Sequence, residues 1–244
     1  MTNAAFAAPD AAPPQPLFYR APVVLHSTVH GAWRLKPGDL SFAAGAAYVP
    51  VVLGEFDQAC CCYPVVFTGD TGHPVAVLGL NDGQNLFVEH GVWAAGQYVP
   101  AYVRRYPFNF APVPGSDRFA LVIDAAPEWV TEDEGEGAPL FENGEPGAVT
   151  RQALQFCEAW QADFAGTEAF VQALRDRDLL VEKRADATLP DGRRYALDGF
   201  RMVDPERLQA LDDATVVDWH RRGWLSRISL HLASIGRFAA LLDR

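Results

Sequence analysis

The pattern of apolar and polar positions is clearest in residues 75–110, where it predicts three strands joined by turns. Asn81-Asp82-Gly83 separates two apolar runs, and such a turn is a strong hairpin signal because glycine readily adopts a positive φ. His90-Gly91 marks a second turn, and Gly96 marks a break before a third strand over 98–108. The rest of the predicted fold is arranged around this stretch.

Apolar and polar residues alternate with a period of two along the third strand, which predicts a half-buried strand with two different faces. One face contains Val99, Ala101 and Val103, and the other contains Tyr98, Tyr102, Arg104 and Tyr106. A guanidinium between tyrosine rings can stack on them while it donates to a carboxylate or phosphate. Tyr102, Arg104 and Tyr106 are therefore the predicted binding residues. Arg105 lies on the opposite face and is expected to make a structural pair. The alternative for Arg104 is also an internal ion pair, with the acidic segment as its partner.

The first half of the chain predicts further short elements. Residues 1–16 are rich in alanine and proline, which predicts disorder or polyproline structure. Residues 22–25 form the first predicted strand, and 33–35 and 40–42 flank a Pro-Gly turn. A short helix is expected after Pro50, closed by Pro64.

An acidic segment over 124–147 separates the β-rich sequence from a helical one. No Lys, Arg or His lies between Arg118 and Arg151, whereas eight acidic residues do. Its glycines and prolines predict an irregular, solvated surface loop. A calcium site is the alternative, but the required alternation of Asp or Asn ligands with a glycine is missing.

From Thr150 the period changes to steps of three and four, which predicts a long helix ending near Leu180. We expect Trp160 on this helix to be buried against the β-rich part. A hairpin follows over 188–203 around Leu189-Pro190-Asp191-Gly192. Asp204-Pro205 is a helix start, Asp212 or Asp213 caps the next helix, and Gly223 precedes a last helix over 224–242.

These elements predict the α+β class: a mostly antiparallel β-rich part packed against a helical part that carries its own β-hairpin. The predicted divisions are 1–16 as a disordered N-terminus, 17–124 as the β-rich part, 125–148 as the acidic loop and 149–244 as the helical part. We expect 17–244 to form one compact unit, as its 228 residues are enough for a sizeable core.

The net charge of −11 argues against non-specific binding to nucleic acid or to an anionic membrane, since both need a basic surface. No apolar run is long enough to span a bilayer, so membrane insertion is not expected. The N-terminal residues lack the pattern of an export signal, and three of the four cysteines are adjacent, at Cys60–Cys62. Both features predict a cytoplasmic protein with reduced thiols.

Catalytic and cofactor motifs are not apparent, so neither a catalytic residue nor a cofactor or metal is predicted. His26 and His30 would be grouped on a helix, but their context predicts strand and loop. Cys60–Cys62 lie at a predicted helix C-terminus, where the helix dipole disfavours a thiolate, so buried, inert thiols are preferred over a nucleophile.

Seven segments occur in the order typical of one bacterial family. They are PLFYRAPVVL, FAAGAAYVPVVLGEF, VLGLNDGQNLFV, GQYVPAYVRRYPF, PLFENGEP, LPDGRRYALDGFRMVDPERLQAL and LHLASIGRF. From about residue 16 to the C-terminus the chain resembles the SapC family. The resemblance implies a link to surface-layer biogenesis, and relatives are often encoded beside TonB-dependent receptors, tryptophan-halogenase-like proteins and cupin-like proteins.

Two functions follow as hypotheses. The first is a non-catalytic, cytoplasmic accessory protein that binds a peptide or protein partner in a surface-related or peptide-modifying pathway. The alternative is an enzyme, or an enzyme subunit of uncharacterised chemistry that works with an oxygenase-like or halogenase-like neighbour. A deep pocket with convergent His, Asp and Arg would favour the enzyme, and a shallow aromatic groove or an exposed sheet edge would favour the binding protein.

Overall fold

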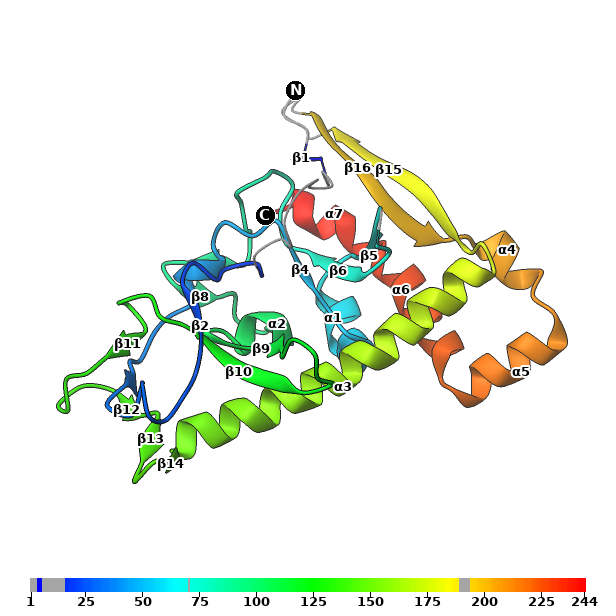
Figure 1. Cartoon of the computed structure of the whole chain (residues 1–244). Helices are drawn as coiled ribbons and strands as arrows, with labels where there is room; N and C mark the ends of the chain where they lie inside the picture. Colours follow the sequence, from blue (N-terminus) through cyan, green and yellow to red (C-terminus); the bar gives the residue numbers. More distant parts are fainter. Residues whose placement is uncertain (1–3, 6–15, 70, 189–193) are drawn as a thin grey trace.

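The computed structural model describes residues 4–5, 16–69, 71–188 and 194–244 and confirms the α+β class. Its longest element is α3 (Ala148–Asp176), a helix of 29 residues. In Figure 1 this helix runs along one side of the molecule, from the β13–β14 hairpin at one end to α4 at the other. Most of the predicted disordered stretch over 1–16 lies outside the described residues.

The largest sheet joins the two halves of the chain. Its strands follow the order β1-β16-β5-β6-β4, and β15 also pairs with β16. They are β1 (Ala4–Ala5), β4 (Tyr48–Pro50), β5 (Val65–Thr68), β6 (Pro74–Val77), β15 (Leu180–Thr188) and β16 (Arg194–Val203). Because β16 pairs with β5 antiparallel, the predicted C-terminal hairpin extends the N-terminal sheet instead of standing apart from it.

Smaller sheets complete the β structure. The order β2-β10-β9 joins Pro22–Val24, Phe119–Asp124 and Phe108–Pro112, and the order β11-β3-β12 joins Val130–Thr131, Arg34–Leu35 and Ala138–Pro139. Two hairpins are β7 (Val88–Glu89) with β8 (Val92–Trp93) and β13 (Phe141–Glu142) with β14 (Glu145–Pro146). The first of them turns at His90-Gly91, as the sequence predicts.

The predicted turn at Asn81-Asp82-Gly83 forms, but the predicted pairing of strands across it is wrong. Gly83 has the positive φ expected of a turn, and Leu86 N–H donates to Leu78 O at 2.8 Å. The run before the turn is nevertheless β6, which pairs with β4 and β5 and not with the run after the turn. Pairing between distant strands has overridden the local signal.

The acidic segment is also more ordered than predicted, since it contains β11 to β14. Arg34 on β3 donates from Nε to Glu136 O at 2.9 Å and from Nη2 to Gly137 O at 2.8 Å. Strands of two residues are too short to produce a periodic pattern, so the sequence carries no sign of them.

The predicted helices are present with shifted ends, whereas α2 lies in the segment predicted to be the third strand. The helices are α1 (Phe56–Cys62), α2 (Ala101–Arg104), α3, α4 (Pro205–Gln209), α5 (Asp213–Arg221), α6 (Trp224–Ser234) and α7 (Arg237–Leu242), with two 3-10 turns at η1 (Ser41–Ala43) and η2 (Leu53–Glu55). The predicted caps Asp204 and Asp212 both accept backbone N–H groups. The helix expected over 224–242 is divided at Ile235-Gly236, and the long helix ends four residues before Leu180, which begins β15.

Three apolar clusters form the core, and α3 connects two of them. Ala153 and Cys157, in its N-terminal half, pack with Phe108, Leu121, Ile123 and Leu140. Phe170, Val171 and Leu174, in its C-terminal half, pack with Phe67, Leu179, Val203, Trp219 and Ile228. The third cluster surrounds β4, β5, β6 and α1. None of the helices in the described part is long and apolar enough to cross a membrane.

Candidate functional site

The segment that carries the predicted binding residues is not a strand. Residues 101–104 form α2, and extended structure resumes only at Phe108 in β9. The buried carboxylate of Glu55 accepts Ala101 N–H at 2.5 Å and the Tyr98 hydroxyl at 2.9 Å. A carboxylate at the start of a helical turn satisfies backbone N–H groups that would otherwise lack partners, so this distant contact favours the turn over the strand.

The three predicted residues consequently do not share a face. Tyr102 and Tyr106 are buried, at 5% and 7% exposure, whereas Arg104 is exposed. Tyr102 packs on Trp160 at 6.2 Å between ring centroids and Tyr106 packs on Phe42 at 4.2 Å, while the Phe18 ring contacts both tyrosines. The three residues therefore do not form one binding surface. A binding role stays a prediction for Arg104, the exposed one of the three.

Arg104 is held at the surface by hydrogen bonds and rings. Its Nε donates to Val99 O at 3.0 Å and its Nη2 to the Tyr98 hydroxyl at 2.9 Å. The guanidinium carbon lies 5.4 Å from the centroid of the Tyr98 ring and 5.3 Å from that of Phe156. No ion pair joins Arg104 to a carboxylate of the described chain, so the alternative pairing with the acidic segment does not form there.

The stacked geometry expected of Arg104 is found at Arg105. Its guanidinium carbon lies 4.1 Å from the ring centroids of both Tyr102 and Trp160, and the side chain is only 7% exposed. Trp160 itself is half-buried, less than predicted, and it contacts the β-rich part through these two residues. In a helical turn residues i and i+3 are neighbours, which places Arg105 beside Tyr102.

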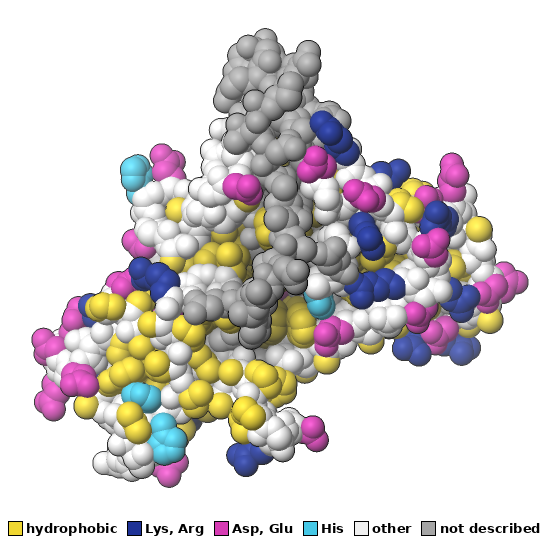
Figure 2. All heavy atoms as spheres, turned by 45° about the horizontal axis from the view of Figure 1, so that its top comes forward, with side chains coloured by type: hydrophobic (Ala, Val, Ile, Leu, Met, Phe, Trp, Pro, Cys, Tyr) yellow, Lys and Arg dark blue, Asp and Glu magenta, His cyan; other side chains and the backbone are white. Residues whose placement is uncertain are grey.

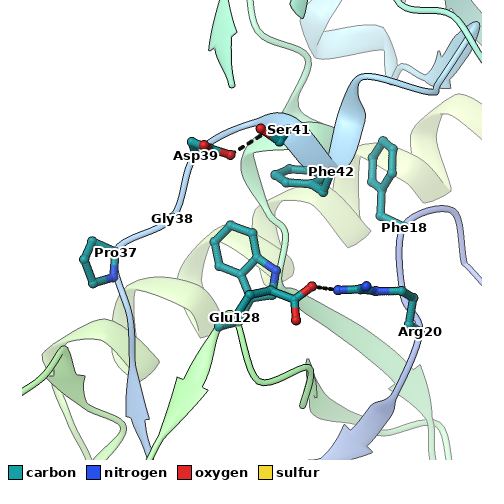
Figure 3. Close-up of a pocket in the computed structure, with 9 residues that line it drawn as sticks. Phe18, Arg20, Pro37, Gly38, Asp39, Ser41, Phe42 and Glu128 are labelled. Carbon is teal, nitrogen blue, oxygen red and sulfur yellow. Dashed lines mark hydrogen bonds and ion pairs between the residues drawn. The ribbon is translucent and has the colours of Figure 1, made fainter. Parts of the chain in front are cut away.

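An open cleft of about 790 Å³ lies next to Tyr106, whose ring packs on two residues of its lining, Phe42 and Trp129. Its apolar walls are Phe18, Phe42 and Trp129, and its polar rim contains Arg20, Glu128, Asp39 and Ser41. Figure 3 shows the rings of Phe18 and Phe42 side by side and nearly perpendicular, and Arg20 reaching Glu128, with which it forms an ion pair. We call this concavity the aromatic cleft.

Three segments of the chain, around residues 18–20, 37–42 and 128–129, build the aromatic cleft. Phe18 and Arg20 precede β2, Pro37–Asp39 follow β3, Ser41 and Phe42 lie on η1, and Glu128 and Trp129 precede β11. A Cβ at Gly38 would overlap the indole of Trp129, so the absence of a side chain allows this ring to lie against the loop. The Asp39 carboxylate accepts Ser41 N–H at 2.9 Å, and this hydrogen bond holds the pKa of Asp39 below its usual value.

Tyr106 supports the cleft from beneath. Its ring centroid is 4.2 Å from that of Phe42 and 5.1 Å from that of Trp129. Its hydroxyl donates to Asp124 Oδ2 at 2.6 Å, and the same buried carboxylate accepts Ala21 N–H at 2.7 Å. Burial, with the Asp124 carboxylate, raises the pKa of Tyr106, so the hydroxyl stays a donor at neutral pH. Asp124 therefore ties Tyr106 to the segment that carries Phe18 and Arg20.

Phe18 adopts φ of 83°. A bulky residue in this left-handed region is strained, and such residues persist where the surroundings hold them in place. Here the Phe18 ring packs edge-on against Phe42 at 5.0 Å and lies 6.0 Å from Tyr106. The fold thus fixes the ring in the wall of the cleft.

The cysteines and histidines do not form a second candidate centre in the part of the chain that the structure describes. All four thiols are free, and burial raises the pKa of Cys60 to about 12 and that of Cys157 to about 11. No group of three His, Cys, Asp or Glu side chains there could hold a metal ion. His26 and His30 lie in one turn, where His26 N–H donates to His30 Nδ1 at 3.0 Å.

Comparison of the sequence with known protein families finds one matching family. The model of the family described as SapC matches residues 25–241. The chain belongs to the SapC family. The match includes both the large sheet from β4 onward and most of the aromatic cleft, so the architecture described above is that of a SapC protein. Neither a curated protein nor a solved structure matches the chain.

Sequence reasoning missed most of the cleft. Phe18, Phe42 and Trp129 come from parts of the chain that are far apart, and none lies in a periodic pattern that marks a site. The Pro37-Gly38 turn was recognisable, but only the structure shows that Trp129 packs on it. Of the predicted residues, Tyr106 supports the cleft from beneath, and Tyr102 contacts its Phe18 wall at 5.8 Å between ring centroids.

Proposed function

We propose that this SapC protein is a non-catalytic binding protein that holds an extended peptide segment of a protein partner in the aromatic cleft. The observation that carries the proposal is the cleft itself: an open concavity walled by three aromatic rings on a fixed scaffold. Aromatic-lined open grooves are typical of peptide recognition, where rings accept apolar side chains and the rim orients the main chain.

The rim suggests how the peptide is oriented. Arg20 and Glu128 form an ion pair whose side chains are 64% and 48% exposed. An exposed pair contributes little to stability, so either partner can exchange its contact for a carbonyl, an N–H group or a charge of the peptide.

The acidic segment beside the cleft favours a partner with basic residues. Glu132 accepts a hydrogen bond from Trp33 Nε1 at 3.2 Å, and the segment from 132 to 136 is exposed. Figure 2 shows Asp and Glu side chains gathered at the end of the molecule that carries β11 and β12, next to hydrophobic side chains. We therefore expect peptides with a large apolar residue flanked by Lys or Arg, and charge complementarity of this kind also speeds association.

Selection of a random peptide library on the full chain, followed by anisotropy titration of the enriched peptides, tests the proposal. Phe42→Ala should weaken the affinity at least tenfold, a loss of about 1.4 kcal/mol, because it removes one wall of the cleft. Phe119→Ala is the matched control, since Phe119 is an exposed aromatic residue that does not line the cleft. Equal affinity of wild type and Phe42→Ala for every enriched peptide would refute the assignment.

A salt titration separates the charged contribution from the apolar one. Affinity should fall between about 50 and 500 mM salt, because exposed charges are screened over about 10 Å at 0.1 M. Peptides in which Lys and Arg are replaced by Gln should bind more weakly and lose this dependence. A salt-independent affinity that is the same for both peptide sets would exclude the acidic segment as part of the interface.

A further inference from the structure

A second cavity, of about 240 Å³, lies between the α2–β9 junction and the N-terminal half of α3. Its lining includes Arg104, Arg105, Pro107, Gln152, Phe156 and Cys157. No residue lines both this cavity and the aromatic cleft. Tyr106 lines this cavity and supports the aromatic cleft from beneath, but the lining residues of the two sites differ, so each site can be tested separately.

Arg105 is the central feature of this cavity. Its side chain is more than nine-tenths buried, and its guanidinium lies between the rings of Tyr102 and Trp160 at 4.1 Å from each centroid. The planes of the two rings are inclined to each other by 65°, so the guanidinium lies in the corner that they form, and contacts on two sides restrict its movement. The side chain is thus held ready for a planar partner.

The buried charge lacks a counter-ion in the described part of the chain. No Asp or Glu there forms an ion pair with Arg105, and its buried Nε has no hydrogen-bond acceptor. The adjacent Trp160 Nε1 is likewise buried without an acceptor. Buried donors almost always have partners, and a buried charge without compensation is strongly unfavourable.

The groups nearest to Arg105 are neutral at physiological pH. Burial raises the pKa of the Tyr19 and Tyr102 hydroxyls and raises that of the Cys157 thiol to about 11, while Arg105 opposes each of these changes. The Tyr19 hydroxyl also donates its proton to Phe108 O at 2.5 Å. These side chains can pack around the guanidinium, but none of them neutralises it.

We propose that the cavity binds a small organic carboxylate, with Arg105 as its principal ligand. A carboxylate matches the planar fork of a guanidinium and would supply the negative charge that Arg105 lacks. Arg104 adds a second positive charge to the cavity lining, and the Gln152 amide adds a further donor. Apolar lining by Pro107, Phe156 and Ala153 suits the short hydrocarbon body of such an acid better than a fully hydrated inorganic anion.

The carboxylate can come from a free acid or from the C-terminus of a peptide, and the test has one probe for each source. Thermal unfolding of the full chain is measured with butyrate and with N-acetylalanine, at constant ionic strength. Butyramide and N-acetylalaninamide are the uncharged controls. We expect a saturable rise in Tm with at least one acid and none with the amides, because a ligand that binds only the folded state stabilises it. An equal rise with inorganic phosphate would overturn the assignment to a carboxylate.

Arg105→Met tests the residue. It should abolish the rise in Tm while the Tm without ligand stays equal to or above that of the wild type, since replacing a buried, uncompensated charge by an apolar side chain of similar size relieves its desolvation. Arg221→Met removes one exposed positive charge on α5 and is the matched control, which should keep the full response.

A measurement on the wild-type chain avoids dependence on the folding of that variant. The chain has six tryptophans, and butyrate should shift one indole N–H resonance, the one that Trp160→Phe removes. No shift of that resonance together with no rise in Tm overturns the proposal, as does a rise in Tm that Arg105→Met retains.

Discussion

Replacing the buried imidazole of His231 should remove a large part of the protein's sensitivity to mild acid. His231 lies on α6 with no exposed surface, between β5 and β16. Its Nδ1 donates to Val65 O at 2.7 Å, and its Nε2 accepts Val203 N–H at 3.2 Å. The register of the two strands, Phe200 opposite Thr68, would bring Val203 opposite Val65 if pairing continued. The imidazole therefore joins Val65 O and Val203 N–H, two backbone groups that would otherwise be neighbours in the sheet.

Both ring nitrogens are used, so the ring must be neutral in the folded protein. Burial lowers the pKa of His231 to about 4 from an ordinary value of 6.5, and the bond to Val65 only partly opposes this. Between these two pH values the unfolded chain binds a proton that the folded chain does not, so the free energy of unfolding decreases as the pH falls. The difference between the two pKa values corresponds to about 3 kcal/mol, lost progressively from pH 6.5 to pH 4.

Urea unfolding at pH 7, 6, 5 and 4, followed by tryptophan fluorescence, measures this loss in the wild type and in His231→Gln. The variant should be about 1–3 kcal/mol less stable at pH 7, because a buried hydrogen bond is broken, but its stability should decrease by about 3 kcal/mol less on acidification. The exposed His220 provides the control His220→Gln, which should follow the wild type. Parallel pH profiles for wild type and His231→Gln would show that the imidazole is not the acid-sensitive group.

Three further substitutions test contacts around α2. Trp160→Ala should reduce the free energy of unfolding by about 2 kcal/mol, less than a fully buried tryptophan would, and a change below about 0.5 kcal/mol in urea unfolding would contradict the packing on Tyr102 and Arg105. Glu55→Gln should reduce it by about 1–3 kcal/mol, because an amide cannot accept all the hydrogen bonds that the carboxylate accepts, and wild-type stability would rule out that role. Arg104→Lys should have a free energy of unfolding within about 1 kcal/mol of the wild type in the same assay. If it does, a tenfold weaker affinity for a selected peptide would support the predicted binding role of Arg104, and an unchanged affinity would exclude that role.

Features that depend on neighbours in the sequence were predictable. Asp204 with Pro205 and Asp212 start their helices as expected, because a capping side chain bonds to N–H groups two or three residues further on. The His90-Gly91 turn forms for the same reason, since its positive φ angles are a local requirement. The helical pattern of apolar residues in α3 extends over many turns, and Gly166 does not interrupt the helix.

Pairing between distant segments was not predictable from one sequence. β6 has a good local partner beyond Asn81-Asp82-Gly83, yet it pairs with β4 and β5, where its side chains are buried among other strands. Nothing in the chain before residue 180 indicates that β16 will continue this sheet. The aromatic cleft depends on such pairings, because β2, β3, η1 and β11 bring its walls together.

The segment around Arg104 and Arg105 shows how a single distant contact decides which residue carries the chemistry. Read as a strand, the sequence places Tyr102, Arg104 and Tyr106 on one face. Glu55 lies 46 residues away and its carboxylate accepts Ala101 N–H, which favours a helical turn. The period then changes from two to about 3.6, so the guanidinium that stacks on Tyr102 is that of Arg105 and not that of its neighbour. The type of interaction, an arginine held between aromatic rings, could be predicted from composition, but its position could not, because the position depends on a carboxylate whose location only the tertiary fold determines.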